Sequence, residues 1–213
     1  MSKVVCIIGE SGSGKTTSCR NLDPKQTFYI DADRKGLSWK GWKEQYNSAN
    51  KNYKQTSNVA KIISILDGIS KNSPHIKYIV IDTLNTIMVD DEVARMKEKG
   101  YDKWQDLAMC VWELCSRIHL MRDDLTVIII AHSQTERDEN GFIFTRMKTS
   151  GKKLDKIALE SKFTTVLLAK CVDGKHVFET KSKNSTVKTP MGSFENDVIE
   201  NDIVKVLAAL TDY

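Results

Sequence analysis

Short apolar runs alternate along this chain with segments in which hydrophobic residues recur at helical spacing. The apolar runs are rich in β-branched residues and lie at residues 3–8, 26–30, 78–81 and 125–131. Uninterrupted runs of this length are typical of strands buried on both faces of a parallel sheet. Helices are predicted at residues 16–22, 59–69, 84–99 and 102–122. This alternation predicts an α/β fold with a mostly parallel central sheet flanked by helices.

The pattern changes after Ala131, where polar residues become frequent. The pair Asn140-Gly141 predicts the turn of a hairpin. Further strands, partly antiparallel, are predicted at residues 152–161, 164–171 and 177–181, and a closing helix at 196–210. The polar, lysine-rich segment 36–57 predicts no particular element. Because no repeat, low-complexity tract or linker interrupts the chain, a single domain over residues 1–213 is predicted.

Composition narrows the functional classes without selecting one. A chain of 213 residues that is 40% hydrophobic can bury one sizeable core. The five cysteines include no C-x-x-C pair, which argues against a disulfide framework or a zinc site. The first apolar run is too short for a signal peptide or a membrane span, so we expect a cytoplasmic protein with no membrane partner. A net charge of +4 permits a nucleic-acid partner but does not require one.

A glycine-rich segment, GESGSGKT at residues 9–16, follows the first predicted strand. It matches the pattern G-x-x-x-x-G-K-[ST], in which glycines let successive backbone N–H groups point at phosphate oxygens. Lys15 is expected to reach the β- and γ-phosphates, and the Thr16 hydroxyl to bind Mg²⁺. The residues expected to contact ATP are Gly9, Glu10, Ser11, Gly12, Ser13, Gly14, Lys15, Thr16 and Thr17. A chance match is the alternative, and the strand before the loop and the helix predicted after it argue against that.

Acidic residues follow two other predicted strands. Asp82 ends the third apolar run and, with Thr16, is the predicted magnesium ligand. An aspartate at a strand end is also a common turn or cap residue. Asp31 and Asp33 follow the second run and are the candidates for a base that activates the attacking water. The alternative is that both cap the next segment or pair with the basic residues beside them.

The order of these motifs resembles that of the RecA-like recombinase and ATPase family, and within it the small phage-type RecA-like ATPases linked to single-strand annealing. The resemblance covers most of the chain and is carried by residues 9–16, Ile30-Asp31-Ala32-Asp33, Asp82, His132 and Lys181-Ser182-Lys183. It implies a RecA-like P-loop NTPase core that hydrolyses ATP. The family residue that matches Asp33 is the general base and is normally glutamate. The shorter aspartate therefore implies slow hydrolysis or a site that closes further on binding.

The same resemblance assigns roles to a histidine and two lysines. His132 stands where the family places a γ-phosphate sensor, usually glutamine, although a strand-end histidine can equally bond a loop carbonyl. Lys181 and Lys183 match a K-x-K pattern that points at the nucleotide of the neighbouring subunit, which implies a homo-oligomer with the ATP site at the subunit interface. A solvated strand face is the alternative. The catalytic residues implied are Lys15, Asp33, Asp82, His132, Lys181 and Lys183.

Positive charge gathers in segment 133–188, which holds twelve Lys and Arg residues against seven Asp and Glu residues. The residues expected to bind single-stranded DNA are Arg137, Arg146, Lys148, Lys152 and Lys153. They lie in a loop that resembles, in position, the DNA-binding part of RecA-like proteins, and five mobile cations suit a phosphate backbone. Phe142 and Phe144 either stack on bases there or form the buried face of a hairpin.

These observations favour a RecA-like ATPase that acts on single-stranded DNA in phage-type recombination, annealing or replication, in the cytoplasm of the host cell. Its hydrolysis is expected to be slow and stimulated by DNA or by assembly. One alternative is a small-molecule kinase for a nucleotide or metabolite, although the chain lacks the compact arginine cluster that such a lid needs. The other alternative is a non-catalytic ATP-binding switch.

Overall fold

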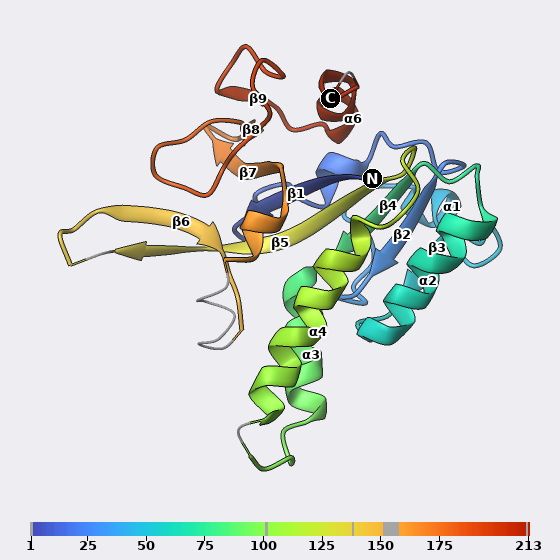
Figure 1. Ribbon diagram of the computed structural model, residues 1–213. Coiled ribbons are helices and arrows are strands. Elements are labelled where there is room, and N and C mark those ends of the chain that lie inside the picture. The colour runs from blue at the N-terminus through green and yellow to red at the C-terminus, as the bar shows by residue number, and fades with distance from the viewer. Residues whose placement is uncertain (1, 101, 138, 151–157, 212) are drawn as a thin grey trace.

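The computed structural model describes residues 2–100, 102–137, 139–150, 158–211 and 213 (Figure 1). Within these ranges, one nine-stranded sheet has the order β3-β2-β4-β5-β1-β7-β8-β9, and β6 pairs with β5. The strands are β1 (Lys3–Gly9), β2 (Thr27–Asp31), β3 (Tyr53–Gln55), β4 (Tyr78–Asp82), β5 (Thr126–Arg137), β6 (Ile143–Met147), β7 (Thr165–Val172), β8 (Lys175–Glu179) and β9 (Val198–Glu200). The neighbours from β3 to β7 run parallel, whereas β6, β8 and β9 pair antiparallel. The predicted α/β fold with a mostly parallel sheet is confirmed.

Helices cover both faces of the sheet (Figure 1). The helices are α1 (Trp42–Gln45), α2 (Val59–Asn72), α3 (Leu84–Ala94), α4 (Asp102–Ile118) and α6 (Ile203–Ala209), with the short 3-10 helices η1 (Thr17–Cys19) and η2 (Leu159–Lys162). One face packs against α2, α3 and α4, and the other against η1 and α6. In the described part of the chain, no helix combines the length and apolar character needed to cross a membrane.

Strand β1 shows why the apolar runs are continuous. Val4, Cys6 and Ile8 belong to the core on the side of α2, α3 and α4, whereas Val5 and Ile7 belong to the core on the opposite side. Because successive side chains of a strand point to opposite faces, a strand covered on both faces must be apolar at every position.

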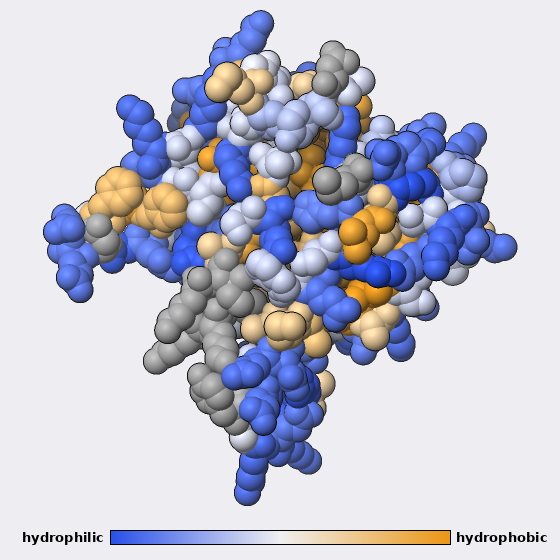
Figure 2. All heavy atoms as spheres, in the orientation of Figure 1, coloured by the Kyte–Doolittle hydropathy of each residue, from blue (hydrophilic) through white to orange (hydrophobic). Residues whose placement is uncertain are grey.

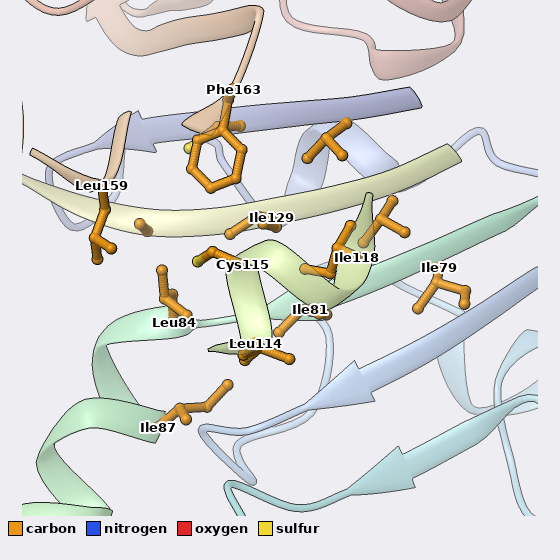
Figure 3. Packing of buried hydrophobic residues seen from close by; sticks show 14 of the residues in the cluster. Ile79, Ile81, Leu84, Ile87, Leu114, Cys115, Ile118, Ile129, Leu159 and Phe163 are labelled. Carbon is orange, nitrogen blue, oxygen red and sulfur yellow. The ribbon is translucent and has the colours of Figure 1, made fainter. Parts of the chain in front are cut away.

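The larger of the two cores lies between the sheet and α3 and α4. Figure 3 shows Ile81 of β4 and Ile129 of β5 beside Leu84 of α3 and Leu114 and Ile118 of α4. All five side chains are at most 1% exposed. This packing fixes the end of β4 at Asp82 and the middle of β5, where His132 lies.

The helix predicted at residues 16–22 is wrong, since the chain forms only the 3-10 helix η1 there. The Ser18 hydroxyl donates to the Lys15 carbonyl at 2.6 Å, and the Arg20 amide donates to the Thr17 carbonyl three residues back at 3.1 Å. A hydroxyl side chain that bonds the local backbone competes with the α-helical pattern, as Ser18 does here.

Two predictions for the later part of the chain also differ from the structure. The closing helix begins only at Ile203, because Val198–Glu200 pairs with β8 as an edge strand and Asp202 caps the helix by accepting from the Val204 amide at 3.0 Å. Of the strand predicted at 152–161, residues 152–157 lie outside the described residues, and Leu159–Lys162 form the 3-10 helix η2.

Candidate nucleotide-binding site

The glycine-rich loop begins at Gly9, the last residue of β1, between the ends of β5 and β7. Gly9 lies opposite His132 on one side and Ala169 on the other. A Cβ atom on Gly9 would lie 2.6 Å from Ser13 Oγ and 2.7 Å from the Ala169 carbonyl, so no side chain fits. Gly14 has φ +91°, a left-handed conformation that favours glycine. The loop therefore needs glycine at position 9, where no side chain fits, and favours it at position 14, where the backbone is left-handed.

Lys15 is buried, and its ammonium lies inside the loop. It donates to the carbonyl oxygens of Gly9 at 3.0 Å and Glu10 at 2.6 Å. Burial lowers the pKa of Lys15 to about 8, and the carboxylate of Asp82 opposes that shift. A cation held by neutral carbonyl oxygens in a partly desolvated loop is a suitable partner for phosphate oxygens.

Asp82 is the last residue of β4, and one oxygen of its carboxylate accepts hydrogen bonds from two hydroxyl groups. The Thr16 hydroxyl donates to Oδ2 at 2.7 Å, and the Tyr29 hydroxyl donates to the same atom at 2.8 Å. Burial raises the pKa of Asp82, and these two hydrogen bonds oppose the rise. The other oxygen, Oδ1, is buried and has no hydrogen-bond partner among the described residues, so one acceptor beside Thr16 remains for a cation.

The pair Thr16 and Asp82 suits Mg²⁺, which prefers hard oxygen ligands. Across the described residues, no group of three or more His, Cys, Asp or Glu side chains could hold a metal ion alone. A cation here would therefore complete its shell with phosphate oxygens and water, as magnesium does in nucleotide sites. When bound, it would neutralise charge on the β- and γ-phosphates.

The structure separates the two aspartates that follow β2. Asp31 is buried, and its Oδ2 accepts from the Gly36 amide at 2.9 Å, the Tyr53 hydroxyl at 2.6 Å and Gln55 Nε2 at 3.2 Å. These bonds tie the turn after β2 to β3. Asp31 therefore holds the local structure together, and Asp33 is the remaining candidate for the base.

Asp33 lies next to the Asp82 backbone, since its amide donates to the Asp82 carbonyl at 3.4 Å. Its Oδ1 accepts from the Thr83 hydroxyl at 2.8 Å and from the Thr86 hydroxyl, and its Oδ2 pairs with Lys35. Burial disfavours the ionised form, but these hydrogen bonds outweigh it and lower the pKa of Asp33. The carboxylate is thus ionised at neutral pH and already oriented.

His132 lies on β5, between the loop strand β1 and the Asp82 strand β4. Its amide donates to Asn85 Oδ1 at 2.6 Å, Asn85 Nδ2 donates to the Lys148 carbonyl at 2.7 Å, and the Lys148 amide donates to the His132 carbonyl at 2.8 Å. Burial, followed by the charge of Lys15, lowers the pKa of His132. A neutral imidazole beside Lys15 is compatible with contact to a γ-phosphate.

Residues 1–189 match a family model described as an AAA domain. The chain belongs to this AAA-domain family. No curated protein matches the chain. Membership makes it an AAA-type P-loop ATPase by family and points to ATP binding and hydrolysis, for which Mg²⁺ is the usual cofactor.

Four side chains of the AAA domain's site were missed by reasoning from the sequence. They are Tyr29, Thr83, Asn85 and Thr86. Thr83, Asn85 and Thr86 directly follow Asp82, so their position after a strand end was a usable signal. Tyr29 carried a weaker signal, a tyrosine inside a buried strand, whose hydroxyl needs a partner.

Lys181 and Lys183 lie beyond β8, on an exposed segment of the AAA domain. Lys181 forms an open ion pair with Asp197 at 3.5 Å, with the two side chains 52% and 71% exposed. Both lysines line a hollow of about 760 Å³ that also includes Ile143 and Thr145 of β6. This exposed location suits both interpretations of the K-x-K pattern: contact with the nucleotide of a neighbouring subunit, or a solvated face.

Three of the five predicted DNA-binding residues lie in the described part of the β5–β6 hairpin. Arg137 and Lys148 are exposed, and Arg146 lies 4.0 Å from Glu136. Lys152 and Lys153 lie outside the described residues. The rings of Phe142 and Phe144 stack with centroids 6.4 Å apart, and Phe142 is 48% exposed. The Phe142 ring is therefore not part of a buried hairpin face.

Proposed function

We propose that this AAA domain hydrolyses ATP at the loop of residues 9–16 and couples its nucleotide state to single-stranded DNA held by the β5–β6 hairpin. The proposal rests on the change of pairing partner along β5. Up to His132 the strand pairs with the loop strand β1, and from Ser133 onward it pairs with β6. One peptide bond therefore separates the candidate γ-phosphate sensor from the start of the hairpin, so displacement of one displaces the other.

The chemistry of the hairpin supports a flexible polyanion with stacking bases as its ligand. The hairpin projects from the sheet, away from the helical layers (Figure 1). Its end shows hydrophobic and hydrophilic groups side by side (Figure 2). Phe142 and Ile143 are 48% and 49% exposed, and Arg137 and Lys148 are exposed on the same hairpin. Aromatic rings and cations together bind single strands by stacking and by phosphate contacts.

The decisive measurement is steady-state ATP hydrolysis with Mg²⁺ at low salt, with and without a long single-stranded oligonucleotide. Stimulation by DNA is expected, and the double variant Arg137→Ala with Lys148→Ala should lose it while basal hydrolysis stays. The control is Lys61→Ala with Lys71→Ala, which removes two exposed charges from α2. Hydrolysis without stimulation or DNA binding would favour a small-molecule kinase, and absent hydrolysis with retained ATP binding would favour a switch.

We further propose that Lys181 and Lys183 act on the nucleotide of a neighbouring copy, because both are exposed on the segment that follows β8. A mixing experiment separates this arrangement from a site within one chain. Lys15→Ala loses nucleotide binding, and Lys181→Ala with Lys183→Ala loses turnover but keeps binding. Equal mixtures of the two inactive proteins should recover up to about a quarter of the wild-type rate if the site is shared. No recovery would place the lysines outside the active site of a neighbour.

In cellular terms, we propose that the protein serves phage-type recombination, annealing or replication in the cytoplasm of the host cell. The support is chemical, because ATP-dependent binding of single strands without base readout is what these processes share. Annealing of complementary oligonucleotides, followed by fluorescence with ATP and with ADP, tests this proposal. An annealing rate that is independent of both the protein and the nucleotide would contradict it.

A further inference from the structure

In the turn after β2, Lys35 lies between two residues, Arg34 and Gly36, that hydrogen bonds hold in place. Arg34 has φ +57°, and its guanidinium donates to Ser57 Oγ at 2.9 Å and pairs with Asp90 at 3.3 Å. Gly36 has φ +79°, and its amide donates to Asp31 at 2.9 Å. A left-handed conformation is unfavourable for arginine and persists where surrounding contacts determine it. The backbone of Lys35 is therefore fixed from both sides, while its side chain is 55% exposed.

The two oxygens of Asp33 have partners of different kinds. Oδ1 accepts from the hydroxyls of Thr83 and Thr86, which belong to the start of α3 and are packed in place. Oδ2 pairs only with the ammonium of Lys35 among the contacts of the described residues. A long exposed side chain exchanges partners easily, whereas the threonines cannot leave. Asp33 thus has one permanently oriented oxygen and one that Lys35 covers reversibly.

The ammonium of Lys35 lies close to the Asp82 strand end, because it pairs with Asp33, whose amide donates to the Asp82 carbonyl at 3.4 Å. Its charge acts on Lys15 and His132, where it adds to burial in lowering the pKa of both, and it also acts on Asp82. The pKa of Lys35 itself is raised, because the bond to Asp33 outweighs partial burial. Lys35 therefore lies within electrostatic reach of the position where a γ-phosphate would meet Lys15 and His132.

We propose that Lys35 is a further catalytic residue of this ATPase, which covers Asp33 without nucleotide and moves to the γ-phosphate when ATP binds. The inference rests on the proposed hydrolysis. The dianionic γ-phosphate competes with the carboxylate of Asp33 for the ammonium and binds it more strongly, because it carries the larger negative charge. Oδ2 of Asp33 is then free. Water then attacks the γ-phosphorus, Asp33 Oδ2 accepts the water proton, and the bond to the β–γ bridging oxygen breaks. ADP leaves with the electron pair, and Asp33 later returns the proton to solvent.

This arrangement makes the base available only when a γ-phosphate is present. With ADP the ammonium has no γ-phosphate to bind and stays on Asp33. Lys35 should therefore distinguish ATP from ADP in binding as well as in turnover, which a residue that only shields Asp33 would not do.

The test compares Lys35→Met with Lys40→Met, which removes an exposed lysine from the same segment. ATP and ADP affinities are measured by calorimetry, and turnover by phosphate release. Lys35→Met should weaken ATP binding about tenfold, leave ADP binding within about twofold, and lower kcat about a hundredfold. Lys35→Arg should recover most of the preference for ATP. Lys40→Met should match the wild type in all three measurements.

The possible outcomes separate this inference from the proposed function. If the wild type hydrolyses ATP and Lys35→Met keeps both its ATP preference and its kcat, the inference is overturned and the ATPase stands. A rise in kcat for Lys35→Met would also overturn it, because the lysine would then only obstruct Asp33. If the wild type does not turn over, the proposed hydrolysis fails, and the ratio of ATP to ADP affinity still decides whether Lys35 meets the γ-phosphate.

Discussion

The Tyr29 hydroxyl donates to Oδ2 of Asp82 at 2.8 Å, the same oxygen that accepts the Thr16 hydroxyl. Tyr29 lies on β2 and is fully buried, so it has no alternative partner in solvent. This bond fixes the orientation of the carboxylate and leaves Oδ1 as the oxygen free for a cation. Tyr29 is thus a positioning residue for the candidate magnesium site.

Tyr29→Phe should weaken Mg²⁺ binding by about tenfold to a hundredfold, since one hydrogen bond to a charged group contributes about 1.5–3 kcal/mol. The hydrolysis rate as a function of Mg²⁺ concentration measures the effect, with saturating metal restoring most of the rate. Tyr46→Phe is the matched control, because its ring lies 5.6 Å from that of Tyr29 between centroids and, among the described residues, its hydroxyl makes no bond to Asp82. Equal metal dependence in both variants would contradict the role of Tyr29.

The affinity for ATP should depend on pH through Lys15. The free protein loses this charge above its pKa of about 8, whereas phosphate oxygens stabilise the protonated form in the complex. Affinity is therefore full below pH 8 and decreases as the pH rises, by about tenfold between pH 7 and pH 9. Calorimetry at both pH values measures this, and the proton uptake on binding at pH 9 is a second readout. Lys15→Arg should remove the pH dependence, because arginine stays protonated.

Gly9→Ala should abolish ATP binding and destabilise the fold. Its Cβ would lie 2.7 Å from the Ala169 carbonyl, a backbone atom of the neighbouring strand that cannot move without breaking the pairing of β1 with β7. Gly68→Ala is the control, since a Cβ there meets nothing within 4 Å and the residue lies in α2. That variant should gain about 0.5–1 kcal/mol in the free energy of unfolding. Denaturant unfolding of both proteins provides the comparison.

Two phenylalanines should respond in opposite ways to truncation. Phe142→Ala should leave the free energy of unfolding nearly unchanged and weaken single-stranded DNA binding by about 1–3 kcal/mol, because the ring is half exposed on the hairpin. Phe178→Ala removes a fully buried ring of β8 and should cost about 3–5 kcal/mol of stability. Fluorescence anisotropy with a labelled oligonucleotide and thermal unfolding measure the two effects. Unchanged DNA affinity in Phe142→Ala would exclude base stacking at that ring.

The sequence by itself determined the fold class and the place of the phosphate loop. Strands buried on both faces must be apolar throughout, so β1, β2, β4 and β5 could be recognised from short stretches of residues. The loop needs particular residues at fixed spacing, so residues 9–16 were recognisable without any tertiary information. Both signals are local, because the residues that define them are close neighbours along the chain.

Only the tertiary structure decided which partners each of the two aspartates after β2 contacts. Asp31 and Asp33 are equivalent as sequence neighbours, yet Asp31 turns to Tyr53 of β3 whereas Asp33 meets Thr83 beside Asp82. The physical reason is strand register. Pairing of β2 with β3 and with β4 sets which side chains meet across the sheet, and that pairing depends on packing between segments far apart in the chain.

The elements that were predicted wrongly or missed have one long-range cause and one local cause. The edge strand β9 forms because β8 offers it a pairing partner, and the 3-10 helix η1 forms where the Ser18 hydroxyl competes for the backbone after the loop. The contact of Lys35 with Asp33 likewise depends on a turn anchored at Asp90 and Asp31. Local patterns therefore determined the fold class and the phosphate loop, and long-range packing determined which side chains surround that loop.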